Sequence, residues 1–181
     1  MSQSSNYRRD IVIARVTLFA LPFLIVVLAV YQDINPSGMR SFSAHIGTPA
    51  AMISALFPEQ RLDAVSRSAG QRIREQPVYF TVRYPHRYDT ARVRVNLSSD
   101  HTVSWRIGIA VQGASDWSYR YATPDQLGSA AFDLTNAQVS DGALRFIIAT
   151  PDNLAMSKVQ IQDIAVVLSR ESLLNTLWRR L

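Results

Sequence analysis

The side chains that most often carry catalysis are few in this 181-residue chain, and they stand in no catalytic spacing. Its three histidines are His45, His86 and His101, and none lies in an HExxH-type zinc motif. The absence of cysteine excludes disulfides, thiolate metal ligands, a cysteine nucleophile and a lipoprotein acylation site. The chain also has no glycine-rich phosphate loop and no GxSxG elbow. We therefore expect a protein that is not an enzyme and needs no metal or cofactor.

The aspartates are scattered through segments that are expected to be turns, where a short carboxylate bonds to the local backbone. A hydrolase that uses paired carboxylates needs two of them to meet in space, which the spacing does not indicate. Calcium binding by loop aspartates stays open. The residues concerned are Asp89, Asp100, Asp116, Asp125, Asp141 and Asp152.

The aromatic residues around position 117 are the first candidate for binding. Trp105 shares a face with isoleucines in its expected strand and is assigned to the core. Trp117, Tyr119 and Tyr121 alternate along the next strand without aliphatic neighbours on their face. Such a Trp/Tyr platform stacks on sugar rings, and the same residue types are enriched at protein interfaces. We expect these three side chains to bind a glycan or a protein partner.

The arginines are the second candidate. The net charge is +5, and only Lys158 among the 19 basic residues is a lysine. Four arginines fall on the polar faces of consecutive expected strands: Arg83, Arg92, Arg94 and Arg106. If these strands pair as hairpins, the arginines form one basic face that would attract anionic headgroups, phosphate-bearing glycans or an acidic partner. The alternative is a solvated face with cross-strand ion pairs.

From residue 77 the apolar residues recur with a period of two, which is typical of half-buried strands. Turn signals separate the strands at intervals of about ten residues, and no helix-length segments lie between them. The pattern predicts a mainly β chain with an antiparallel β-sandwich, jelly-roll-like, at residues 77–169. The strands are expected at residues 77–84, 90–97, 103–111, 117–122, 129–134, 143–150 and 158–169. In the last strand the alternation shifts near Asp163, which predicts a β-bulge.

The segment that would hold this domain in place is residues 11–31, IVIARVTLFALPFLIVVLAVY. It has no charged residue from Val16 to Gln32. A helix that crosses the hydrocarbon core of a bilayer needs roughly 20 apolar residues, and in lipid the backbone must satisfy its own hydrogen bonds. We predict one transmembrane helix at residues 11–31, after a cytoplasmic tail at residues 1–10, with membrane lipid as its partner.

The flanks of this segment predict its orientation. Arg8, Arg9 and Arg15 stand at its N-terminal side, whereas the next basic residue after it is Arg40. The positive-inside rule then places the N-terminus in the cytoplasm and the β domain outside the cell membrane. A domain without cysteine in that location fits a bacterial periplasm or cell surface. Nucleic acid is therefore not an expected partner.

A cleavable signal peptide is the alternative for the same segment. Val27, Leu28 and Ala29 give a small-residue cleavage pattern. The apolar run exceeds the roughly 7–15 residues of a signal peptide's apolar region, which favours a retained anchor. Both interpretations export the domain.

Residues 32–76 are expected to connect the anchor to the sandwich. Thr48 as an N-cap and Pro49 at the first helical position predict a short helix. Its apolar stripe would consist of Met52, Ile53, Leu56 and Phe57. This segment is either an amphipathic helix near the membrane or an element that closes the domain.

Residues 170–181 return to a helical period. One stripe of the expected amphipathic helix consists of Leu173, Leu174, Leu177, Trp178 and Leu181. This helix is too short to span a membrane, which takes roughly 20 residues. It suits a membrane interface, a protein partner or docking on the sandwich.

The arrangement of residues 76–169 resembles the jelly-roll β-sandwich domains of the carbohydrate-binding-module type. The resemblance lies mainly in LRFIIATPD followed by VQIQDIAVVLS, which look like the last two strands of such modules. It implies glycan binding without catalysis through exposed aromatic side chains. The same sandwich also serves protein assembly, so the resemblance does not choose between these functions.

Together these patterns predict a non-enzymatic, single-pass accessory or assembly subunit of a cell-envelope membrane complex. Its extracytoplasmic sandwich would contact other membrane or envelope proteins. The alternative is a membrane-tethered glycan-binding module.

Overall fold

The computed structural model describes residues 15–27, 38–66, 70–84, 88–99, 104–113, 118–149, 159–171 and 178. The chain divides into two compact units, Met1–Ser37 and Gly38–Leu181.

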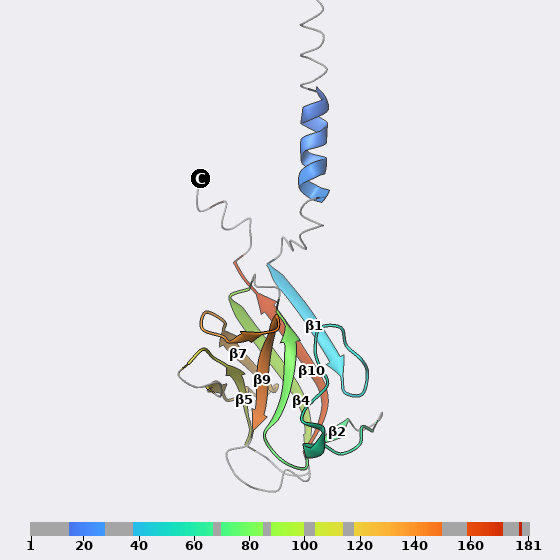
Figure 1. The fold of residues 1–181 in the computed structure, drawn as a ribbon, viewed down its shortest axis with the longest axis vertical. Coiled ribbons are helices and arrows are strands. Elements are labelled where there is room, and N and C mark those ends of the chain that lie inside the picture. The colour runs from blue at the N-terminus through green and yellow to red at the C-terminus, as the bar shows by residue number, and fades with distance from the viewer. Residues whose placement is uncertain are drawn as a thin grey trace, which may run out of the picture. The chain divides into compact units, whose positions relative to one another are not determined.

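The first unit contains a helix at residues 15–27 (Figure 1). Its first residue is Arg15, Thr17 is its one other polar residue, and the remaining side chains are apolar on every side. The predicted helix is therefore confirmed over these 13 positions, whereas the rest of the predicted segment at 11–31 lies outside the described residues. No helix within the described residues is both long enough and apolar enough for a membrane crossing. The transmembrane span stays a prediction.

The second unit consists of two antiparallel sheets that form a sandwich (Figure 1). The β10 sheet has the strand order β1-β10-β4-β7, and β2 also pairs with β10. The β9 sheet has the order β3-β9-β5-β6, and β8 also pairs with β9. The strands are β1 (Met39–His45), β2 (Gln71–Arg72), β3 (Val78–Arg83), β4 (Thr90–Ser99), β5 (Arg106–Ala110), β6 (Tyr119–Ala122), β7 (Ser129–Asp133), β8 (Val139–Ser140), β9 (Ala143–Ala149) and β10 (Val159–Ser169), with one 3-10 turn, η1 (Glu59–Arg61). The predicted mainly β, antiparallel class is confirmed.

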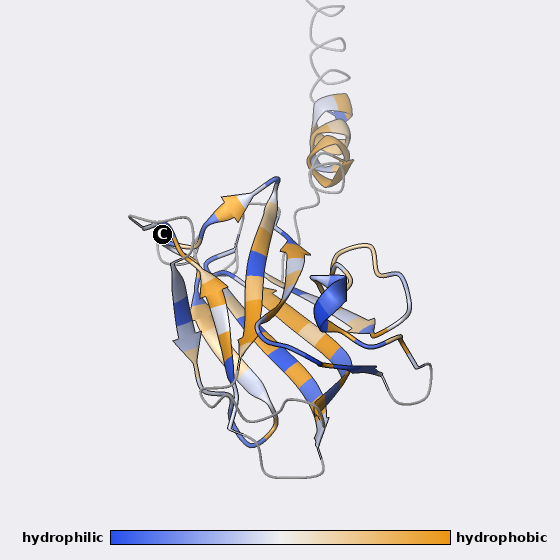
Figure 2. Cartoon of the chain, turned by 60° about the horizontal axis from the view of Figure 1, so that its bottom comes forward, coloured by the Kyte–Doolittle hydropathy of each residue, from blue (hydrophilic) through white to orange (hydrophobic). Residues whose placement is uncertain are grey.

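The core lies between the two sheets and follows from the period-two pattern. Alternate residues of β3, β4 and β10 are buried, and hydrophobic and hydrophilic positions accordingly alternate along strands in Figure 2. Phe146 of β9 is fully buried. Its ring stacks on Phe80 at 5.3 Å and meets Phe132 edge-on at 5.8 Å between centroids. Trp105 is partly buried against this core, as the sequence predicted.

The β-bulge predicted near Asp163 is confirmed. The pairing of β10 with β4 changes register between Ile161 and Asp163. Because of this extra residue, Ile161 and Ile164 both point into the core, and each is fully buried. The bulge lets one long strand keep its apolar side inward along its whole length.

The predicted helix that begins at Thr48 does not form. Residues around Ile53 and Phe57 instead run beside β3, in isolated bridges to Val82 and Tyr79. Hydrogen bonding to β3 explains the difference, because it satisfies backbone groups that a helix would have paired internally. Phe57 N–H, for example, donates to the Tyr79 carbonyl at 2.9 Å. The alternative, an element that closes the domain, is the correct one.

The predicted connecting segment also contributes regular structure. β1 and β2 both lie within residues 32–76 and pair with β10. The β10 sheet therefore begins at Met39, ahead of the first predicted strand. Of the predicted C-terminal helix at 170–181, only residues 170, 171 and 178 are described, and Trp178 is 82% exposed.

Phe146→Ala should lower the free energy of unfolding by about 3–5 kcal/mol, because it leaves a cavity between Phe80 and Phe132. Urea unfolding followed by circular dichroism measures the change. The control is Arg92→Ala on the exposed face of β4, which should shift the value by less than about 0.5 kcal/mol. Equal effects of the two substitutions would contradict the packing described.

Candidate functional site

An aromatic strip crosses the outer face of the β9 sheet, the face that points away from the core. We use this name for Phe57, Tyr79, Tyr119 and Tyr121. Tyr79 lies on β3 at one side of the sheet, and Tyr119 and Tyr121 lie on β6 at the other. The strip therefore unites side chains from three separate parts of the sequence.

Neighbouring rings of the strip contact one another in sequence. Phe57 stacks on Tyr79 with 5.6 Å between ring centroids and 23° between planes. Tyr79 lies 6.2 Å from Tyr119 at 37°, and Tyr119 lies 6.2 Å from Tyr121 at 43°. The rings of Tyr79 and Tyr119 thus meet although β9 and β5 separate their strands.

The rings of β3 and β6 meet above the two central strands of the sheet, β9 and β5. Register aligns Tyr79, Ile147, Gly108 and Tyr121 in one row across the four strands. Ile147 is on the outer face but only 3% exposed. A Cβ atom at Gly108 would lie 2.6 Å from Ile147 Cγ2 and 2.9 Å from Tyr121 Cδ1. The glycine is needed at this position because it leaves room for the Tyr121 ring.

Burial and mutual proximity raise the pKa of Tyr119 and Tyr121. Burial raises the pKa of Tyr119, Tyr79 raises it further, and Arg145 lowers it. Burial and Tyr79 likewise raise the pKa of Tyr121, which Arg106 lowers. These two tyrosines are therefore uncharged at neutral pH, with guanidinium groups beside them.

The predicted platform is present in part. Tyr119 and Tyr121 share the outer face and are in contact, whereas Trp117 lies outside the described residues. Tyr121 is 46% exposed and Tyr119 is half-buried. The 43° between the two rings means that they do not form one flat surface.

Sequence reasoning missed Phe57 and Tyr79. The alternation of VYFTVR already places Tyr79 on the face opposite Val78 and Phe80, so its outward direction was available from the sequence. For Phe57 the sequence predicts either a short helix, which does not form, or an element that closes the domain, which does. No sequence signal showed that either ring would meet β6.

The four predicted arginines do not form one basic face. Arg83 on β3 and Arg106 on β5 belong to the β9 sheet, but Arg92 and Arg94 are on β4 in the β10 sheet. All four point outward, so the two pairs lie on opposite outer faces of the sandwich. The expectation of a single face was wrong because β3, β4 and β5 alternate between sheets instead of pairing as hairpins.

A polar cluster surrounds the bulge on the outer face of the β10 sheet. His45 Nδ1 lies 2.7 Å from Asp163 Oδ1, and Asn96 Nδ2 donates to Asp163 Oδ2 at 3.4 Å. A surface hollow of about 250 Å³ is lined by these strands at Arg94, Asn96, Asp163 and Ala165. No group of three or more metal-ligating side chains occurs among the described residues.

Asp125, one of the predicted turn aspartates, and Asp133 at the end of β7 both serve the local backbone. The Asp125 carboxylate accepts hydrogen bonds from the N–H groups of Leu127 and Ser129, both at 2.9 Å. Asp133 accepts from the N–H and hydroxyl of Thr135, and these bonds lower the pKa of Asp133. Both carboxylates therefore act as turn caps.

Tyr119→Phe and Tyr84→Phe remove the same hydroxyl from two half-buried tyrosines and should differ in effect. The Tyr84 hydroxyl donates to the Tyr88 carbonyl at 2.6 Å, so its removal should cost about 1 kcal/mol. The buried Tyr119 hydroxyl makes no hydrogen bond of good geometry among the described residues. Tyr119→Phe should therefore leave the free energy of unfolding near neutral pH undiminished, as urea titrations of both variants can show.

The same variant gives a pH dependence. Because folding raises the pKa of Tyr119, its contribution to stability is complete below the unfolded tyrosine pKa of about 10. That contribution is lost as the pH rises through the folded pKa. Wild type should lose more stability than Tyr119→Phe between about pH 8 and about pH 11. Equal losses of unfolding free energy in the two proteins would contradict a raised pKa of Tyr119.

Comparisons with known proteins provide no family. No protein-family model matches the chain, and no curated protein matches it. Among solved structures the chain is similar to one titled "Crystal Structure of FLHE", with a TM-score of 0.39 and 13% sequence identity. The likeness covers 74% of this chain and 97% of that chain. A TM-score at this level does not establish a shared function.

Proposed function

We propose that this chain is a non-enzymatic, membrane-anchored accessory subunit of a cell-envelope protein complex. In this proposal the N-terminal helix holds the sandwich at the outer side of the cell membrane, in a bacterial periplasm or at a cell surface. The aromatic strip binds a second envelope protein. The observation that carries the proposal is this strip of contacting rings on an outer sheet face.

The composition of the strip supports a protein partner. Tyrosine and arginine are the residue types that dominate binding energy at protein interfaces, where aromatic rings form the dry centre. Here Tyr121 is 46% exposed, and Arg106 and Arg145 lie beside the tyrosines. Mutual packing already fixes the rings, so binding would order few further side chains.

The N-terminal helix supports a membrane location. A helix that is apolar on all sides is stable only inside protein or in lipid. Residues 15–27 have this character, and the apolar sequence continues beyond them to Tyr31. Anchoring would raise the local concentration of the sandwich beside partners in the same membrane.

The ends of the sandwich are compatible with a second contact. Met39 at the start of β1 pairs with Ser169 at the end of β10, so both flanking segments join the β10 sheet at one end. We propose that the C-terminal segment adds an apolar contact with lipid or with the same partner. Its residues would be Leu173, Leu174, Leu177, Trp178 and Leu181.

Glycan binding is the second candidate, and it is favoured by the tyrosines of the strip and the arginines beside them. It agrees with the resemblance to jelly-roll carbohydrate-binding modules. A sugar ring stacks best on a flat aromatic surface, however, and adjacent rings of the strip are inclined by 23° to 43°. This inclination makes a protein partner the better proposal.

The anchor can be tested by placing charge within the helix. Leu21→Arg with Ile25→Arg should release the protein from membranes into the soluble fraction, since each central arginine costs about 2.5–3.5 kcal/mol on insertion. Alkaline carbonate extraction and immunoblotting measure the distribution. Leu21→Ala with Ile25→Ala is the matched control and should stay in the pellet. Extraction of the wild-type chain by carbonate would refute the anchor.

The strip can be tested by photocrosslinking in cells. A benzoylphenylalanine at Tyr121 should form an adduct with one protein, whereas the same group at Ser41, on the outer face of the β10 sheet, should not. Adding Tyr79→Ala should abolish the adduct because it removes a ring from the middle of the strip. Once mass spectrometry identifies the adduct, Tyr121→Ala should weaken binding of the purified partner by about 2 kcal/mol, or roughly 30-fold.

The outcomes separate the two candidates. Equal labelling from Tyr121 and Ser41 would refute the strip as a protein interface. Binding on a glycan array that is lost in Tyr121→Ala, without any protein adduct, would establish the glycan alternative instead.

A further inference from the structure

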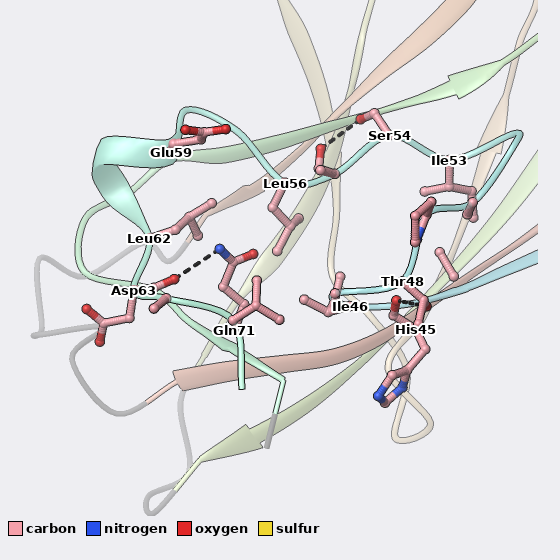
Figure 3. A pocket seen from close by; sticks show the side chains of 17 residues that line it. His45, Ile46, Thr48, Ile53, Ser54, Leu56, Glu59, Leu62, Asp63 and Gln71 are labelled. Carbon is pink, nitrogen blue, oxygen red and sulfur yellow. Dashed lines mark hydrogen bonds between the residues drawn. The ribbon is translucent and has the colours of Figure 1, made fainter. Parts of the chain in front are cut away.

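A cavity of about 720 Å³ opens beside the end of β1, and His45, which pairs with Asp163 at the bulge, forms part of its wall (Figure 3). Its walls come from the chain after β1, from the segment that runs beside β3, and from η1 with the residues that follow it. Isolated bridges hold these walls to the sandwich, Ile53 to Val82 and Leu62 to Ile73. The cavity is therefore built into the fold, and its volume is within the roughly 300–1,000 Å³ of ligand sites.

The interior of the cavity is aliphatic. Ile46, Ile53, Leu56 and Leu62 line it in Figure 3, and these four residues also belong to the hydrophobic core of the sandwich. No phenylalanine, tyrosine or tryptophan occurs among the described residues that line it, although His45 does. It therefore offers no surface on which a planar base or a sugar ring would stack.

The polar groups of the walls are already bonded within the protein. Ile46 N–H donates to the Gln162 carbonyl at 2.9 Å, and Ser54 N–H donates to the Thr81 carbonyl at 2.9 Å. The Gln71 amide nitrogen donates to the Asp63 carbonyl at 3.0 Å. A ligand that needs several hydrogen bonds would find few partners here, and this disfavours sugars and nucleotides.

Among the charged groups at the cavity, the Glu59 carboxylate is the one available to a ligand, because the others are in ion pairs within the described residues. His45 pairs with Asp163 at 2.7 Å, and the Asp63 carboxylate pairs with Arg74. The exposed Glu59 forms no ion pair within the described residues. Its negative charge at the rim opposes an anionic head group.

We propose that this cavity binds a single unbranched hydrocarbon chain whose head group carries no net negative charge. The chain would lie against the aliphatic wall, and the head group would remain at the rim near Glu59. Both a free amphiphile and a lipid acyl chain have this chemistry. The inference does not depend on the proposed function of the aromatic strip.

The experiment uses the absence of cysteine in the chain. Ala64→Cys at the rim of the cavity accepts one environment-sensitive dye on the full chain, which is kept in a fluorinated surfactant that mixes poorly with hydrocarbon. Titration with octanol, nonanol and decanol should give a saturable change in dye emission. Affinity should rise about fourfold with each added methylene.

Three comparisons make the test specific. The same dye at Ser41→Cys, on the outer face of the β10 sheet, should not respond. Ala44→Leu, which adds volume at the cavity wall, should weaken the binding of decanol at least tenfold. The matched Ala131→Leu on the exposed face of β7 should leave the affinity for decanol unchanged. If Ala44→Leu does not fold, Ala55→Trp at the exposed rim takes its place.

Head-group charge and ligand source form the remaining arms. Decanoate should bind at least threefold more weakly than decanol, and Glu59→Gln should remove that difference. Vesicles of a phosphatidylcholine test a lipid chain as the source, and a response to alkanols alone assigns the site to a free amphiphile. The proposal would be overturned if dye emission changed linearly with alkanol concentration without saturating. It would also be overturned if the dye responded equally at Ala64→Cys and Ser41→Cys.

Discussion

The long strand β10 is the constraint on which the rest of the sandwich depends. It pairs with β1, β2 and β4, so the whole β10 sheet except β7 is hydrogen-bonded directly to it. A regular strand of this length would turn part of its apolar side to solvent after the alternation shifts. The bulge between Ile161 and Asp163 corrects the direction and keeps both ends of the strand packed on the β9 sheet.

The bulge also determines which side chains lie on the outer face of the β10 sheet. The bulge brings Asp163 opposite Asn96 and beside His45, which gives the β10 sheet a polar outer face. The β9 sheet carries contacting aromatic rings on its outer face instead. Because β3, β4 and β5 alternate between the sheets, neighbouring segments of the sequence supply these two different surfaces.

Much of the fold could be predicted where a strand is half-buried and its alternation is regular. In β4, Val93 and Val95 point inward between outward arginines, and this pattern is readable from the sequence alone. The pattern of β1 is weak, since in MRSFSAH only Ala44 is buried, and its partner on β10 lies more than a hundred residues away. The direction of a side chain is thus a local property, which periodicity reports.

The pairing of strands is not a local property, and this limited the prediction of the candidate site. Tyr79 and Tyr121 could each be placed on an outer face, but their place in one row depends on β9 and β5 lying between their strands. Gly108 illustrates the same limit, because its role is clear only once Ile147 and Tyr121 are known to flank it. Net charge and arginine positions likewise gave no information about which sheet each arginine would join.

The pairing of Met39 with Ser169 has a mechanical consequence. The two strands that continue into the flanking segments are antiparallel neighbours, and they leave the ladder at the same end. Tension applied between these segments would open the hydrogen bonds of β1 and β10 one pair at a time, from Met39 towards His45, instead of loading all of them at once. The sandwich would yield to such a pull by peeling from its first strand, while the β9 sheet keeps its own hydrogen bonds.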